Sequence, residues 1–130
     1  MRFIINKIEY ESNLIIVTGN TSIGSLKGIW IYAQPPVIEE LYHIELTIYS
    51  LTQLEMKQNK KLKPSIYLSG DTITFKGICE DIDSDVYFLR FDIDWIEMIE
   101  IVQLPCQKKI GEYIFFSANY HDIKIFPYTI

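Results

Sequence analysis

The chain has only 2 alanines among its 130 residues, although alanine is the best helix former. It has instead 24 isoleucines, 9 tyrosines and 7 phenylalanines, residue types that suit the pleated surface of a sheet. No apolar run approaches the roughly 18 residues that a membrane-spanning helix needs. These shortages exclude a helical membrane protein, argue against a helical bundle and favour strands.

Cysteine, histidine and positive charge are also in short supply. The two cysteines, Cys79 and Cys106, are too few for a disulfide framework and lack CxxC spacing. The N-terminal segment has no apolar run typical of a signal peptide. The formal net charge of −5 argues against nonspecific nucleic-acid binding. We therefore expect a reduced cytoplasmic protein that contacts neither membrane nor nucleic acid.

Alternation of apolar and polar residues runs through most of the chain. It predicts strands at 42–49, 71–80 and 95–101. It also predicts a hairpin turning at 11–13 and two strands around a turn at 119–122. We expect one domain over residues 1–130, an all-β antiparallel barrel, closed or partly closed, of about 7–9 strands. A β-sandwich is the alternative.

Two segments interrupt this alternation. Residues 19–41 carry three glycines and Pro35-Pro36, which predicts a long surface connection holding one short strand at Gly28–Tyr32. Residues 50–63 open with Ser50 followed three positions later by Gln53, the spacing of a helix capping box. We therefore predict one short helix there.

No catalytic set stands out. In the glycine-rich stretch at 19–28, Gly24 is followed by Ser25 rather than by the lysine of a phosphate loop. The only candidate bases are His43, in a predicted strand, and His121, in a predicted turn. Cys106 has no identifiable partner, so a buried or incidental thiol is the default interpretation. We predict no catalytic residue and no cofactor.

Asp81, Asp83 and Asp85 occupy the first, third and fifth positions of a calcium-loop count. That pattern requires glycine at the sixth position and glutamate at the twelfth. Val86 and Asp92 stand there instead, which excludes a helix-loop-helix calcium site. An irregular site on a strand loop remains the alternative, whereas our prediction is that the chain has no metal site.

Residues 77–101 hold most of the negative charge. They contain eight carboxylates and one basic residue, Arg90, for a net −7, while the rest of the chain carries nine acids and eleven bases, for a net +2. One interpretation is that these acids keep an apolar sheet in solution and protect its edges. The other is that a local negative field steers a basic partner.

The second interpretation predicts a partner-binding ridge. Aspartates favour turns because they bond their own backbone, so turns are expected at Asp81–Asp85 and at Asp92–Asp94. Trp95 is a candidate anchor, since tryptophan is enriched among residues that dominate interface energy. The residues predicted to form the ridge on adjoining loops are Asp81, Asp83, Asp85, Asp92, Asp94, Trp95 and Glu97.

The stretches YHIELTI (42–48), GICEDIDSDVYFLRFDIDWIEMIEI (77–101) and IKIFPY (123–128) give the chain a resemblance to small acidic β-rich immunity proteins of bacterial toxin systems. The resemblance implies a non-enzymatic protein that occludes a basic toxin. The alternative function is a small-ligand binder, or a weak enzyme, with its site at the barrel mouth. A pocket with convergent polar groups would favour this alternative.

Overall fold

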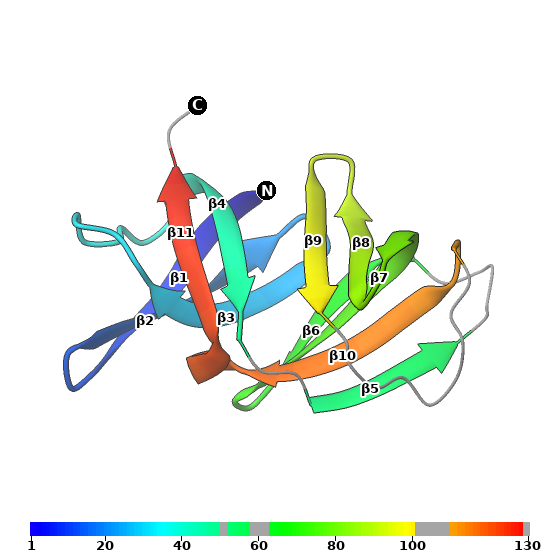
Figure 1. Ribbon diagram of the computed structural model, residues 1–130. Coiled ribbons are helices and arrows are strands. Elements are labelled where there is room, and N and C mark those ends of the chain that lie inside the picture. Colours follow the sequence, from blue (N-terminus) through cyan, green and yellow to red (C-terminus); the bar gives the residue numbers. More distant parts are fainter. Residues whose placement is uncertain (50–51, 58–62, 101–109, 129–130) are drawn as a thin grey trace.

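The computed structural model describes residues 1–49, 52–57, 63–100 and 110–128. This part of the chain contains eleven strands, one 3-10 helix and no α-helix (Figure 1). The predicted all-β class is therefore confirmed. None of the helical structure in the described ranges has the length and apolarity needed to cross a membrane.

Five strands close into a barrel. They are β1 (Arg2–Glu11), β2 (Leu14–Thr21), β3 (Gly24–Trp30), β4 (Leu41–Ile48) and β11 (Ile123–Tyr128). The spatial order β4-β1-β2-β3 is a Greek key, because three hairpin-connected strands are followed by a fourth beside the first. β11 pairs with β4 on one side and with β3 on the other, which closes the sheet on itself. Five-stranded Greek-key barrels include the OB-fold.

This barrel is smaller than the sequence predicts, and it is not wholly antiparallel. β3 and β11 run parallel, with Ile29 opposite Lys124 and Trp30 opposite Ile125. The predicted barrel of about 7–9 strands is matched only in part, because period-two alternation detects strands without showing which of them share a closed sheet. The remaining strands extend the sheet beyond the barrel.

Six strands lie between β4 and β11 in the chain. They are β5 (Thr52–Lys57), β6 (Ser65–Ser69), β7 (Thr72–Asp83), β8 (Val86–Asp92), β9 (Trp95–Glu100) and β10 (Tyr113–Asn119). The order β6-β7-β10-β5 continues the sheet, and β7 also pairs with β8, which pairs with β9. The hairpin β8–β9 therefore folds back toward the barrel, and β9 lies near β4 in Figure 1.

Short-range turn signals placed several elements correctly. The hairpin β1–β2 turns at Ser12–Asn13, with Ser12 at a φ of 52°. The turn between β10 and β11 is the 3-10 helix η1 (Tyr120–Asp122), capped by the Asn119 side chain, which accepts from the His121 backbone N–H. The predicted long connection at 19–41 is wrong, because β2 and β3 form a tight hairpin and only residues 31–40 form a loop.

The helix predicted at 50–63 is also wrong within the described residues. Residues 52–57 form β5, which pairs antiparallel with β10 and places Met56 opposite Ile114. The capping-box spacing is a local signal, whereas β5 is fixed by a partner strand nearly sixty residues away in the chain. Residues 50–51 and 58–62 lie outside the described part of the chain.

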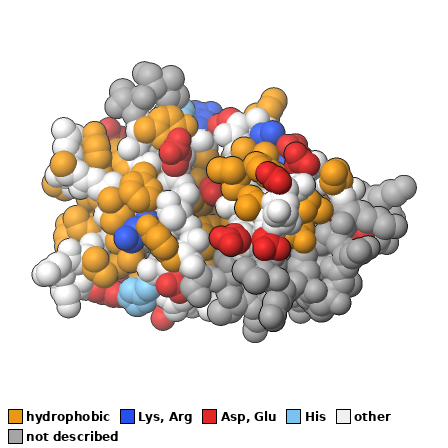
Figure 2. Space-filling view, in the orientation of Figure 1, with side chains coloured by type: hydrophobic (Ala, Val, Ile, Leu, Met, Phe, Trp, Pro, Cys, Tyr) orange, Lys and Arg blue, Asp and Glu red, His pale blue; other side chains and the backbone are white. Residues whose placement is uncertain are grey.

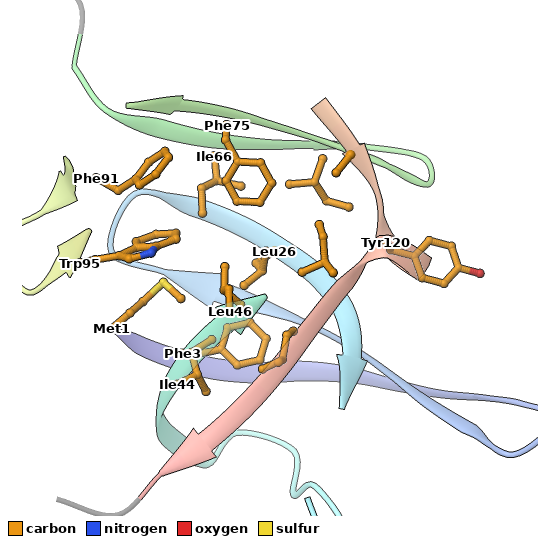
Figure 3. Packing of buried hydrophobic residues seen from close by; sticks show 14 of the residues in the cluster. Met1, Phe3, Leu26, Ile44, Leu46, Ile66, Phe75, Phe91, Trp95 and Tyr120 are labelled. Carbon is orange, nitrogen blue, oxygen red and sulfur yellow. The ribbon is translucent and has the colours of Figure 1, made fainter. Parts of the chain in front are cut away.

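One hydrophobic core joins the barrel to the inserted strands. Phe3, Leu26 and Ile44 come from the barrel, and Phe75 and Phe91 come from β7 and β8; all belong to one buried cluster (Figure 3). The rings of Phe75 and Phe116 are stacked with centroids 4.9 Å apart. The barrel and the insertion therefore stabilise each other through shared burial of apolar surface.

Gly24 marks the backbone junction of the two parts. Its φ is 143°, and a Cβ built there would lie 2.0 Å from the carbonyl oxygen of Ile66. Ile66 in turn donates its N–H to the carbonyl of Ile23 at 3.0 Å. Only glycine lets β3 and β6 approach this closely.

Candidate functional site

The five aspartates of 77–101 lie at or beside two separate hairpin turns. At the first, Asp81 and Asp83 belong to the end of β7 and Asp85 follows Ser84 in the turn, and all three aspartates are exposed. At the second, Asp92 ends β8 and Asp94 lies in the turn before β9. The seven residues of β8 separate the two turns, a distance of about 20 Å at the usual rise of a strand. The single ridge on adjoining loops that the sequence predicts is therefore not formed.

Trp95 is a core residue. Its side chain is 4% exposed, and its ring centroid lies 4.9 Å from that of Phe91. Figure 3 shows the indole beside Phe91 and near Met1, pointing into the buried cluster. The prediction of an exposed anchor was wrong, because Trp95 occupies the inward positions of β9 together with Ile99.

Glu97 shares this inward side of β9, since residues two apart in a strand point to the same face. Trp95 donates its Nε1–H to Glu97 Oε1 at 2.9 Å. Burial raises the pKa of the Glu97 carboxyl to about 7, the charge of Glu45 adds to the increase, and the bond from Trp95 opposes it. Glu97, predicted to belong to the partner-binding ridge, is therefore partly buried, and the pKa of its carboxyl lies near neutral pH.

A groove of about 520 Å³ separates β4 from β9. We call it the β4–β9 groove. It is lined by Met1, Ile44, Glu45, Leu46, Thr47, Ile48, Asp94, Trp95, Ile96, Glu97, Met98, Ile99 and Tyr128. Its volume is in the range of ligand-binding pockets, roughly 300–1,000 Å³.

The charge of the groove is negative. Glu45, Asp94 and Glu97 contribute carboxyl groups, and no lysine or arginine is among the described residues that line it. The Met1 amino group lies 3.7 Å from Asp94 Oδ2. Figure 2 shows acidic side chains gathered near the middle of this face, next to hydrophobic ones. The groove therefore offers carboxylates above an apolar floor.

Of the predicted residues, the structure brings Asp94, Trp95 and Glu97 to this groove, and Asp92 lies just beyond it. Ser22 donates its hydroxyl to the Asp92 carboxylate, which keeps the pKa of that carboxyl low. Sequence reasoning missed Glu45. The alternation of 42–49 placed it correctly on the polar face of its strand, but only the fold puts this face opposite β9.

A second polar cluster lies at the far end of β1. Tyr120 donates its hydroxyl to Glu11 Oε1, and His121 Nε2 lies 2.9 Å from Glu11 Oε2. The Lys27 ammonium stands 4.1 Å above the Tyr120 ring. These bonds lower the pKa of Glu11, first through Tyr120 and then through His121. The hydrogen bond to Glu11 raises the pKa of the buried Tyr120 phenol to about 12. The cluster ties η1 to β1.

Removing the phenol from this cluster should lower thermal stability in a pH-dependent way. A carboxyl with a lowered pKa in the folded state stabilises the protein above its ordinary pKa, and this contribution is lost as the pH falls through the lowered value. Tyr120→Phe should therefore reduce the melting temperature by a few degrees at neutral pH, and by less at about pH 3. Thermal unfolding followed by circular dichroism at both pH values measures this.

Tyr10→Phe is the matched control, because Tyr10 is 72% exposed. It should leave the melting temperature nearly unchanged. If Tyr120→Phe lowered the melting temperature equally at both pH values, the ionised form of Glu11 would contribute nothing to the stability of the cluster.

The described side chains include no group of three histidine, cysteine or carboxylate residues arranged to hold a metal ion. Comparisons with protein-family models, with curated proteins and with solved structures find no match for this chain.

Proposed function

We propose that this protein is a non-enzymatic protein-binding module that recognises a basic partner at the β4–β9 groove. The observation that carries the proposal is the groove itself, which gathers three carboxyl groups over an apolar floor, with no lysine or arginine among the described residues that line it. Complementary charge across an interface selects the partner and speeds association.

The outer face of the hairpin β8–β9 extends this surface. Ile93, Ile96 and Met98 are 93%, 42% and 68% exposed, and clusters of exposed apolar residues mark interaction sites. A standard interface covers about 800 Å² on each partner, more than a groove of this volume provides alone. The partner therefore contacts both the groove and the hairpin, while Asp81, Asp83 and Asp85 steer it from a distance.

The resemblance to immunity proteins gives this proposal its specific form, a cytoplasmic bacterial protein that neutralises a basic toxin. Occlusion needs a surface that covers the toxin, and no chemistry on the side of the inhibitor. The groove and the hairpin supply such a surface.

Reversing charge in the groove should slow and weaken binding of the native partner. The variant is Glu45→Lys with Asp94→Lys, and its matched control is Asp83→Lys with Asp85→Lys at the first acidic turn. Charges there lie about 20 Å from the second turn, beyond the roughly 8 Å over which fields persist at physiological salt. We expect the groove variant to lose about tenfold or more in affinity at physiological salt, and the control to lose association rate only at low salt.

The measurement begins with capture of partners from the native host by the tagged wild-type protein. Association and dissociation rates of the identified partner are then measured for each variant at both salt concentrations, after circular dichroism confirms that the variants fold. A partner that binds wild type and groove variant with equal rates would place the interface elsewhere, and an acidic partner would contradict the proposed charge complementarity.

A small ligand is the second candidate, favoured by the volume of the groove and by Glu97, whose pKa of about 7 lies near physiological pH. Perturbed carboxyl groups in a pocket are characteristic of ligand-binding and catalytic sites. The groove chemistry fits a ligand with an amine and an apolar body. Thermal stabilisation by such amines, abolished by Glu97→Gln, would favour this second candidate.

A further inference from the structure

The residues that line the β4–β9 groove are consecutive in both strands. Ile44 to Ile48 line one wall, and Asp94 to Ile99 line the other. Side chains alternate between the two faces of a strand, so a pocket formed against one face would be lined by every second residue. Consecutive lining residues show that the groove runs along the edges of the strands, where backbone groups are accessible.

Along the groove, the edges of β4 and β9 that face each other have no partner strand in the part of the chain that the structure describes. β9 pairs with β8 alone. β4 pairs with β1 only at its beginning, where Ile44 donates its N–H to the carbonyl of Met1 at 2.8 Å. Backbone amides alternate sides along a strand, so the N–H groups of Leu46 and Ile48 point to the same side as that of Ile44, toward the groove. The N–H of Tyr49 points away from the groove and donates to the carbonyl oxygen of Asp122 in η1, which agrees with this alternation.

The two edges also have a favourable orientation. β4 and β9 run in the same direction in Figure 1. One strand that entered the groove in the opposite direction would therefore be antiparallel to both. Antiparallel pairing on two sides satisfies the backbone groups of the added strand and of both edges.

The side chains around the groove specify what such a strand carries. Its inward residues meet an apolar floor that includes Leu46 and Ile99, and the Glu97 carboxyl lines the same groove. Its outward residues meet Glu45, which is exposed. A carboxylate that points inward from an edge strand also discourages pairing with an uncharged strand, because it would be desolvated without a partner. Lysine or arginine on the incoming strand removes this penalty.

We propose that the basic partner inserts an extended segment between β4 and β9 and pairs with both edges by β-strand addition. This inference rests on the proposed function and adds the mode of recognition. Main-chain hydrogen bonds supply affinity in this mode, and pockets for alternate side chains supply specificity. The segment carries basic residues that alternate with apolar ones.

The probe is a fluorescent peptide of about eight residues that alternates lysine and valine, a length typical of one strand. Its first control has the same composition with the lysines in one block and the valines in another. Its second control has the alternating sequence with N-methyl groups on alternate backbone nitrogens, which removes donors along one edge and leaves the side chains unchanged. Fluorescence polarisation measures each affinity for the wild-type protein and for Glu45→Gln with Glu97→Gln.

We expect the alternating peptide to bind about tenfold or more tightly than either control, and the double variant to bind it about tenfold less tightly. Hydrogen exchange followed by NMR gives an independent readout. The amides of Leu46 and Ile48 should exchange rapidly in the free protein and become protected when the peptide binds.

The outcomes separate this inference from the function on which it rests. Equal binding of the N-methylated peptide, or amides of Leu46 and Ile48 that stay unprotected, would overturn strand addition and leave side-chain recognition of a basic partner intact. Absence of binding by every peptide would overturn the extended-segment mode, while charge-dependent binding of the native partner would still support the proposed function. Equal binding of the alternating peptide to the double variant would show that the groove carboxyls do not take part.

Discussion

Glu97→Gln should increase the free energy of unfolding at about pH 8 by about 3 kcal/mol and leave it nearly unchanged at about pH 4. The folded state holds the Glu97 carboxyl at a pKa of about 7, against an ordinary value of 4.5. The folded protein therefore binds more protons than the unfolded chain between these values. Its stability decreases as the pH rises through this range, because the unfolded state accommodates the ionised carboxylate more easily.

Glutamine removes the charge and keeps an oxygen that can accept the indole N–H of Trp95. The charged groups that line the groove with Glu97 remain in place. They are Asp94 in the turn before β9, Glu45 on β4 and the Met1 amino group. Chemical denaturation at several pH values gives the free energies of unfolding. The wild type and the variant are compared where their unfolding free energies have the same slope against denaturant concentration. The stability of the wild type should fall between about pH 5 and pH 7, whereas that of the variant should show less of this decrease.

The control is Glu100→Gln, which removes an exposed carboxyl from the same strand and should change stability by less than about 0.5 kcal/mol at either pH. A loss of stability at pH 8 in Glu97→Gln would contradict the assignment, since it would show that the ionised carboxylate is stabilised in the fold.

Trp95→Ala should destabilise the fold by about 3–5 kcal/mol, the usual cost of deleting a large buried aromatic side chain. The indole is buried against Phe91 and donates its N–H to Glu97. The variant therefore creates a cavity beneath the groove and leaves the Glu97 carboxyl without its donor. Equilibrium denaturation at pH 7 measures the loss directly.

Trp95→Phe is the companion variant, because it keeps an aromatic ring and removes the N–H donor. It should be less destabilising than Trp95→Ala, since most of the buried volume is retained. If Trp95→Ala kept the stability of the wild type and lost only partner affinity, Trp95 would be an exposed anchor, and the burial described above would be wrong.

Local patterns in the sequence predicted the strands and several of the turns. Alternation over 42–49 and 95–101 is a property of neighbouring residues, and β4 and β9 lie there. The turns at 11–13 and 119–122 depend on residues within a few positions of each other. The closure of the barrel could not be predicted in this way. It pairs Ile29 with Lys124, and nothing in a single sequence specifies such a distant register.

The site could have been predicted in part. The alternation of Trp95, Glu97 and Ile99 places the glutamate on the inward face, but an acid is usually assigned to solvent because burial of its charge is costly. The two acidic turns belong to successive hairpins that share β8. This topology alone puts Asp83 and Asp94 at opposite ends of one strand. The position of Glu45 opposite β9 depends on the fold of the whole insertion.

The position of β11 in the chain has a consequence for folding. Four barrel strands lie within the first 48 residues, and the strand that joins β3 to β4 begins only at Ile123. Until β11 docks, β3 and β4 expose unpaired edges, and strands with exposed edges are prone to aggregate. Long-range pairing of this kind slows folding to milliseconds or seconds. The yield on refolding should therefore decrease as protein concentration rises, and emergence of β11 from the ribosome should be the event that permits the barrel to close.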